Sequence, residues 1–77
     1  MLTSISRIAN RMATLRRQLY NELGNSKLQL AMEAVSLDDE EDMWKRLNQL
    51  LPSDNRHVWA ARVHTLVLLD RALDAKF

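Results

Sequence analysis

Residues 55–77 read NRHVWAARVHTLVLLDRALDAKF, and this stretch is the densest apolar segment of the chain. Its large apolar side chains recur at steps of three and four residues, the spacing of one helical face. They are Trp59, Val63, Leu66, Leu69, Leu73 and Phe77. Further apolar residues widen this face beyond half of the circumference, namely Val58, Ala61, Leu68, Ala72 and Ala75. We expect a helix with so wide an apolar face to be enclosed by the rest of the chain or by a second chain.

The N-terminal third carries the most regular pattern, an apolar seam with heptad-like spacing. The seam consists of Ile5, Ile8, Met12, Leu15, Leu19 and Leu23. Apolar residues continue at helical spacing after Gly24, which favours one long helical arm over residues 4–35, with a kink allowed at the glycine. The alternative is a break near residues 24–26, with Gly24 as a C-cap and Ser26 opening a new helix through a capping box.

The middle of the chain contains a second start signal and a stop signal. Ser36 is a suitable N-cap, and Pro52 disfavours a helical residue before it, so we expect a helix over residues 37–51. Five consecutive acidic residues, 38–42, fall at the beginning of this helix, where the helix dipole favours negative charge. The apolar C-terminal stretch then forms the last helix, over residues 54–76.

These patterns predict an all-α fold. We expect a small antiparallel helical bundle, or helical hairpin, of three to four helices in a single domain of residues 1–77. A chain of 77 residues, of which 47% are hydrophobic, has too little interior to hide its apolar surface. Self-association or a partner is therefore expected to complete the core. Because the sequence contains no cysteine, disulfides and thiolate metal sites are excluded, which fits a cytoplasmic location.

The sequence shows no segment expected to cross a membrane. No apolar run approaches the roughly 18 residues that a spanning helix needs, and Arg7 and Arg11 interrupt the place where a signal peptide would have its apolar core. Residues 1–21 contain four arginines and no acidic residue, a composition shared with mitochondrial transit peptides. The interpretation that we favour for this segment is an ordinary basic amphipathic helix.

Charge is unevenly distributed, although the net charge is only +1. Residues 1–35 carry a net charge of +3 and residues 36–77 a net charge of −2. The candidates for contacts with nucleic-acid phosphates are Arg7, Arg11, Arg16 and Arg17. They make a dimeric nucleic-acid-binding regulator the alternative function. These side chains project to different sides of a helix, however, and the acidic residues 38–42 would repel DNA if the helix after them entered the major groove.

Signatures of catalysis are absent from the sequence. A single glycine cannot build a phosphate-binding loop or a nucleophile elbow. His57 and His64 are seven residues apart on one helix, about 10 Å along its axis, which is too far for both to bind one metal ion. We therefore expect no catalytic residue, no cofactor and no metal, and we do not expect an enzyme.

The pattern favours a small helical protein–protein interaction subunit, an adaptor or a chaperone-like protein, that oligomerises or binds a partner through the apolar faces of residues 4–23 and 55–77. The expected interface residues are Ile8, Met12, Leu15, Leu19, Trp44, Trp59, Val63, Leu66, Leu69, Asp70 and Leu73. Two charged residues, Arg62 and Asp70, lie near the apolar face. They either reach water at its edge or fix the register of a contact with another helix or chain.

In size and helix layout, the chain resembles the short helical co-chaperones of bacterial secretion systems. The resemblance concerns architecture alone, since no motif residue carries it. It implies a role as a co-chaperone-like component of such a system, and it assigns no site residue.

Overall fold

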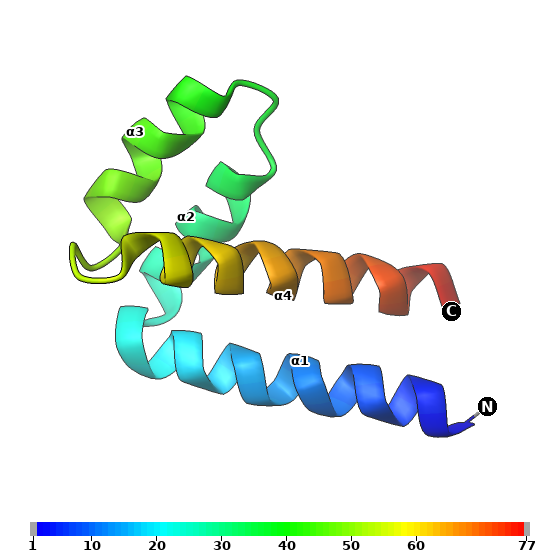
Figure 1. Ribbon diagram of the computed structural model, residues 1–77. Coiled ribbons are helices and arrows are strands. Elements are labelled where there is room, and N and C mark those ends of the chain that lie inside the picture. The colour runs from blue at the N-terminus through cyan, green and yellow to red at the C-terminus, as the bar shows by residue number, and fades with distance from the viewer. Residues whose placement is uncertain (1, 77) are drawn as a thin grey trace.

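The computed structural model of the protein describes the backbone of residues 2–76 and the burial of side chains in residues 6–75. Within this span there is no strand, and the chain forms four helices, α1 (Leu2–Leu23), α2 (Asn25–Val35), α3 (Glu40–Leu50) and α4 (Arg56–Lys76) (Figure 1). The predicted all-α class with three to four helices is confirmed. α1 and α4 lie side by side and antiparallel, while α2 and α3 form a second pair at one end of them.

The alternative prediction of a break near residues 24–26 is confirmed, because the helix breaks at Gly24, and the continuous helical arm over residues 4–35 is wrong. The backbone of Gly24 has φ 83° and ψ 164°, a conformation that is open to glycine and strained for other residues. Its N–H still donates to the Tyr20 carbonyl at 2.8 Å, and its own carbonyl accepts from the Leu28 N–H at 3.0 Å. One residue thus closes α1 and opens α2, and no side chain caps α2. The predicted capping box at Ser26 is therefore also wrong.

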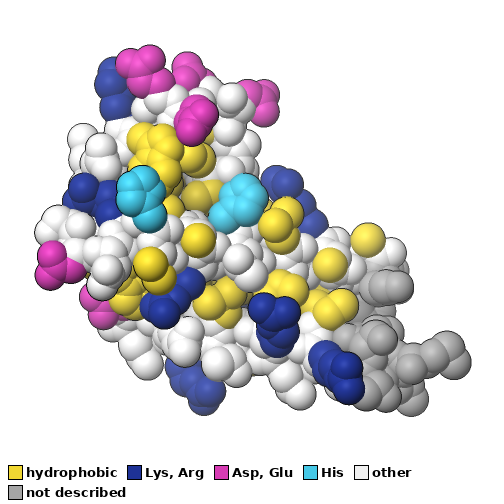
Figure 2. All heavy atoms as spheres, in the orientation of Figure 1, with side chains coloured by type: hydrophobic (Ala, Val, Ile, Leu, Met, Phe, Trp, Pro, Cys, Tyr) yellow, Lys and Arg dark blue, Asp and Glu magenta, His cyan; other side chains and the backbone are white. Residues whose placement is uncertain are grey.

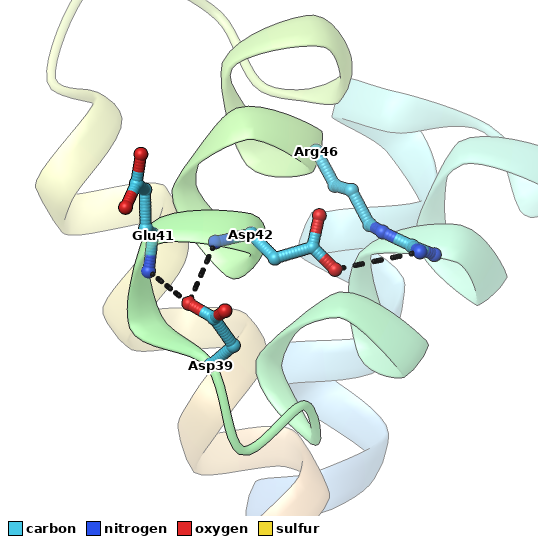
Figure 3. Close-up of polar contacts among 4 residues, drawn as sticks. All are labelled: Asp39, Glu41, Asp42 and Arg46. Atoms are coloured by element: carbon cyan, nitrogen blue, oxygen red, sulfur yellow. Dashed lines mark hydrogen bonds and ion pairs between the residues drawn. The ribbon is translucent and has the colours of Figure 1, made fainter.

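The helix predicted over residues 37–51 begins three residues later, because Asp39 and not Ser36 is its N-cap. Oδ1 of Asp39 accepts hydrogen bonds from the backbone N–H groups of Glu41 at 3.0 Å and Asp42 at 3.2 Å (Figure 3). The Ser36 hydroxyl instead donates to the Met32 carbonyl at 3.0 Å, and it therefore closes α2. Three acidic residues lie in the first turn of α3, where the helix dipole favours them.

Only one ion pair joins side chains in the described part of the chain. It links Asp42 and Arg46 at 3.6 Å, one turn apart on α3 (Figure 3). Both side chains are about half exposed, so water screens the pair and it contributes little to stability.

The connection from α3 to α4 is fastened by an arginine at the start of α4. Nη2 of Arg56 donates to the carbonyls of Asn48 and Leu51, each at 3.4 Å. These carbonyls lie at the C-terminus of α3, where a positive charge complements the helix dipole. Asn55 precedes α4 with φ 58°, a left-handed conformation that asparagine tolerates. The last helix therefore begins at Arg56, two residues after the predicted start.

The core lies where α2 meets the C-terminal end of α1 and the N-terminal half of α4. It consists of Leu19, Leu23, Leu28, Ala31, Ala34, Val35, Leu47, Leu51, Ala60, Val63 and Leu66. Every member is aliphatic, and among the described side chains no polar or charged residue is buried. Two residues of the predicted apolar faces, Ile5 and Phe77, lie outside the residues whose side chains are described. No helix of residues 2–76 combines the length and the apolar character needed to cross a membrane.

Candidate interaction surface

The helices α2 and α3 cover one end of the α1–α4 pair. We call the other end the open half, and it consists of the N-terminal half of α1 and the C-terminal half of α4. The helices α2 and α3 have 11 residues each and span about 16 Å, whereas α1 and α4 have 22 and 21 residues and span about 32 Å. The short pair therefore cannot cover the long pair along its whole length (Figure 1).

Burial follows this coverage along both long helices. The buried residues of α1 are Leu19 and Leu23, both near its C-terminus, and those of α4 are Ala60, Val63 and Leu66, in its N-terminal half. The apolar seam nevertheless continues into the open half. Its described members there are Ile8, Met12, Leu69 and Leu73, which are half-buried, and of these Met12 packs against the core. Within residues 6–75, the apolar side chains of the open half are thus less completely enclosed than those under α2.

A groove of about 600 Å³ runs between α1 and α4. We call it the α1/α4 groove, and it is lined by Asn10, Arg11, Thr14, Leu15, Gln18, Val58, Ala61, Arg62 and Thr65. On the α4 wall Val58 and Ala61 are apolar and Arg62 and Thr65 are polar, and Val58 remains 46% exposed. Leu68, one turn beyond Thr65, is 50% exposed. Figure 2 shows hydrophobic side chains gathered over α4 and along its border with α1.

The charge of the groove is positive on both walls. Arg11 comes from α1 and Arg62 from α4, and none of the residues that line the groove is acidic. The Arg62 guanidinium lies 4.8 Å from the centroid of the Trp59 ring, so a cation–π contact holds it beside the groove. The acidic side chains gather mainly at the opposite end of the molecule, over the start of α3 (Figure 2).

The four arginines considered for nucleic-acid binding do not share one surface. All are exposed, and only Arg11 lines the groove. Arg7 lies one turn before Arg11 on the same side of α1, whereas Arg16 and Arg17 follow at positions that turn away from it. The arginines therefore do not form the continuous basic stripe that tracks a phosphate backbone.

The predicted interface residues fall into two groups. Leu19, Val63 and Leu66 are buried in the core of the chain itself. The others are half-buried, and they are Ile8, Met12, Leu15, Trp44, Trp59, Leu69, Asp70 and Leu73. Asp70 is half-buried on α4 and forms no ion pair with any described side chain. Contacts of this second group with a partner remain a prediction.

Both histidines line a smaller hollow between α3 and α4. The hollow has a volume of about 240 Å³, and His57 and His64 share it with Trp44. The rings of His57 and Trp44 meet edge to face, with centroids 5.1 Å apart and planes at 64°. Within the described residues, no group of three or more histidine, cysteine or acidic side chains is arranged to hold a metal ion.

The sequence pattern missed which apolar residues stay outside the core. Tyr20, Leu30, Val58 and Leu68 are each about half exposed. The sequence feature that could have indicated this exposure was the width of the apolar face of residues 55–77. Because α1 and α2 cover only one side of α4, a face wider than half of the circumference has to leave part of itself open.

With this geometry described, the chain was compared with known protein families, curated proteins and solved structures, and none of them matches it.

Proposed function

We propose that the protein is a small helical interaction subunit of the cytoplasm, an adaptor or a chaperone-like protein, that associates with a protein through the apolar faces of α1 and α4. One observation carries this proposal. The apolar seam that is buried under α2 continues, at the same spacing, into a half of the α1–α4 pair where none of its described members is fully buried. If a partner encloses the half-buried leucines of this half, the gain in binding free energy is about 25 cal/mol for each Å² of apolar surface removed from water.

The surface also has the chemical variety of an interaction site. The half-buried residues of α1 and α4 include Met12, Trp59 and Arg62, and tryptophan and arginine are enriched among the residues that dominate binding energy. Methionine adapts its shape to different partners because its side chain is unbranched and flexible. These features support protein binding, and none of them requires a reaction centre.

The test is photo-crosslinking from single positions of the full chain. A photoreactive amino acid replaces Leu68, which is half exposed beside the groove, or Lys45, which is exposed on α3. We expect a discrete adduct from position 68, with the mass of a second copy or of another protein, after irradiation in an extract of the source cells. Position 45 is the matched control and should give none. The absence of an adduct at position 68, or equal adducts at both positions, contradicts the proposal.

A further inference from the structure

We propose that the α1/α4 groove binds an amphipathic helix with acidic flanks, supplied by a different protein. The inference rests on the proposed function and names the chemistry of the partner at that surface. Three observations carry it, namely the apolar side chains of Leu15, Val58 and Ala61 in the groove, its two arginines, and the absence of acidic residues from its lining.

The dimensions of the groove suit a helix. Along α1 the lining extends from Asn10 to Gln18, and along α4 it extends from Val58 to Thr65, which corresponds to about 10–12 Å on each wall. Two to three turns of a third helix would lie along this length. Leu15, Val58 and Ala61 would then contact apolar side chains at i, i+3, i+4 and i+7 of the incoming helix.

The backbone chemistry of the groove also favours a helix over an extended segment. Both walls are helices whose N–H and C=O groups are already bonded within α1 and α4. They offer no strand edge with which an extended peptide could pair. A helical partner satisfies its own backbone, so it can bury an apolar stripe without leaving backbone groups unpaired.

The charges of the groove define the flanks of this helix. Arg11 and Arg62 stand on opposite walls, and Trp59 holds Arg62 in place. A carboxylate on each side of the apolar stripe would meet one guanidinium. Because these arginines are at the rim, their main effects are on the association rate, the specificity and the salt dependence.

A second copy of this chain fits the groove poorly. Two copies docked face to face would bring Arg11 and Arg62 of each copy toward those of the other, with no acidic residue in either lining. Half of the acidic residues of the chain, residues 38–42, lie at the start of α3, but α3 turns Leu47 into the core and packs Met43 and Trp44 against it. The start of α3 therefore offers acidic charge without a free apolar stripe beside it.

The test uses two synthetic amphipathic helices of about five turns with the same leucine stripe. Glutamates flank the stripe in one peptide and lysines in the other, and each peptide is labelled and titrated with the full chain by fluorescence anisotropy. We expect the glutamate peptide to bind about tenfold more tightly at roughly 50 mM NaCl, and its advantage to shrink at roughly 500 mM. Equal affinities, or no binding of either peptide, overturn the inference.

Two double variants distinguish an effect of the groove arginines on peptide binding from an effect of the net charge of the chain. The pair Arg11→Glu and Arg62→Glu should reverse the preference toward the lysine peptide. The pair Arg16→Glu and Arg17→Glu changes the net charge by the same amount outside the groove, and it should keep the preference for the glutamate peptide. Identical behaviour of the two double variants contradicts the inference. A neutral pair, Arg11→Gln and Arg62→Gln, should abolish the preference, and circular dichroism checks that each variant is folded.

Different results would reject the proposed function and the proposed acidic helix. A crosslink from position 68 together with no charge preference would leave the interaction function standing and would reject the acidic helix. A charge preference that disappears in the groove variants supports the acidic helix even where the crosslinked protein is a second copy bound on the open half and not in the groove.

Discussion

Arg62 and Trp59 lie three residues apart on α4, and the guanidinium of the arginine is 4.8 Å from the centroid of the indole ring. The contact joins a core-packed aromatic residue to the charged rim of the α1/α4 groove. It gives Arg62 a preferred orientation that the exposed arginines of α1 lack.

The first prediction concerns the strength of this contact. A double-mutant cycle with Arg62→Gln and Trp59→Leu should give a coupling free energy of about 0.5–1 kcal/mol, the range of partly exposed cation–π pairs. The free energies of unfolding are measured in urea. A second cycle that pairs Trp59→Leu with Arg71→Gln is the control, because Arg71 is exposed and lies three turns further along α4. Equal coupling in the two cycles would show that the Arg62 contact is not specific.

The second prediction concerns the break between α1 and α2. Gly24→Ala should lower the free energy of unfolding by about 1–3 kcal/mol, because alanine is strained at φ 83° and ψ 164°. A Cβ atom at this position would meet nothing within 4 Å, so the loss comes from the backbone and not from a clash. Urea unfolding followed by circular dichroism measures it.

Ser26→Ala is the control for the break. Ser26 is exposed within the first turn of α2 and caps nothing, so its replacement should change stability by less than about 0.5 kcal/mol. A neutral or stabilising Gly24→Ala, with a gain in helix content, would mean that residues 4–35 form a continuous helix in solution.

The third prediction distinguishes the two candidate caps of α3. Asp39→Ala should cost about 1 kcal/mol, because it removes the acceptor of two backbone N–H groups. Asp39→Ser should retain most of this stability. Ser36→Ala should cost less than about 0.5 kcal/mol, since its exposed hydroxyl only supplements the end of α2. Thermal unfolding of the three variants tests the order, and a larger loss for Ser36→Ala than for Asp39→Ala would place the helix start at residue 37.

The sequence pattern was sufficient for the class of fold and for the C-terminal ends of α2, α3 and α4. Apolar spacing alone identified the helical stretches, and Pro52 marked the end of α3 to within a residue of Leu50. The start of α3 was not predictable in the same way, because Ser36 and Asp39 are both good N-cap residues. Which of the two residues caps α3 depends on the hydrogen bond that the Ser36 hydroxyl donates to the Met32 carbonyl, and the sequence does not reveal this hydrogen bond.

The candidate surface was predictable only in part, for a related reason. The seam on α1 and the apolar face of α4 were visible, but local spacing cannot show which part of a wide face the other helices will cover. That depends on the direction in which α2 leaves Gly24. The turn at Gly24 places Leu28 and Ala31 in the core, and it leaves Val58 and Leu68 outside. The α1/α4 groove therefore depends on the tertiary arrangement of the helices, which local spacing does not show.

The last prediction compares two leucines that are two residues apart on α4. Leu66 is fully buried and Leu68 is 50% exposed. Leu66→Ala should destabilise the chain by about 2–5 kcal/mol, because it leaves a cavity in the core, whereas Leu68→Ala should change stability by less than about 0.5 kcal/mol. Urea unfolding provides the first readout. The second readout is the adduct formed from a photoreactive residue at Val58, which lines the groove. Leu68→Ala should weaken this adduct without unfolding the chain, because the side chain belongs to the contact surface. Equal losses of stability for the two leucines would contradict the orientation of α4, and an unchanged adduct would place Leu68 outside the interface.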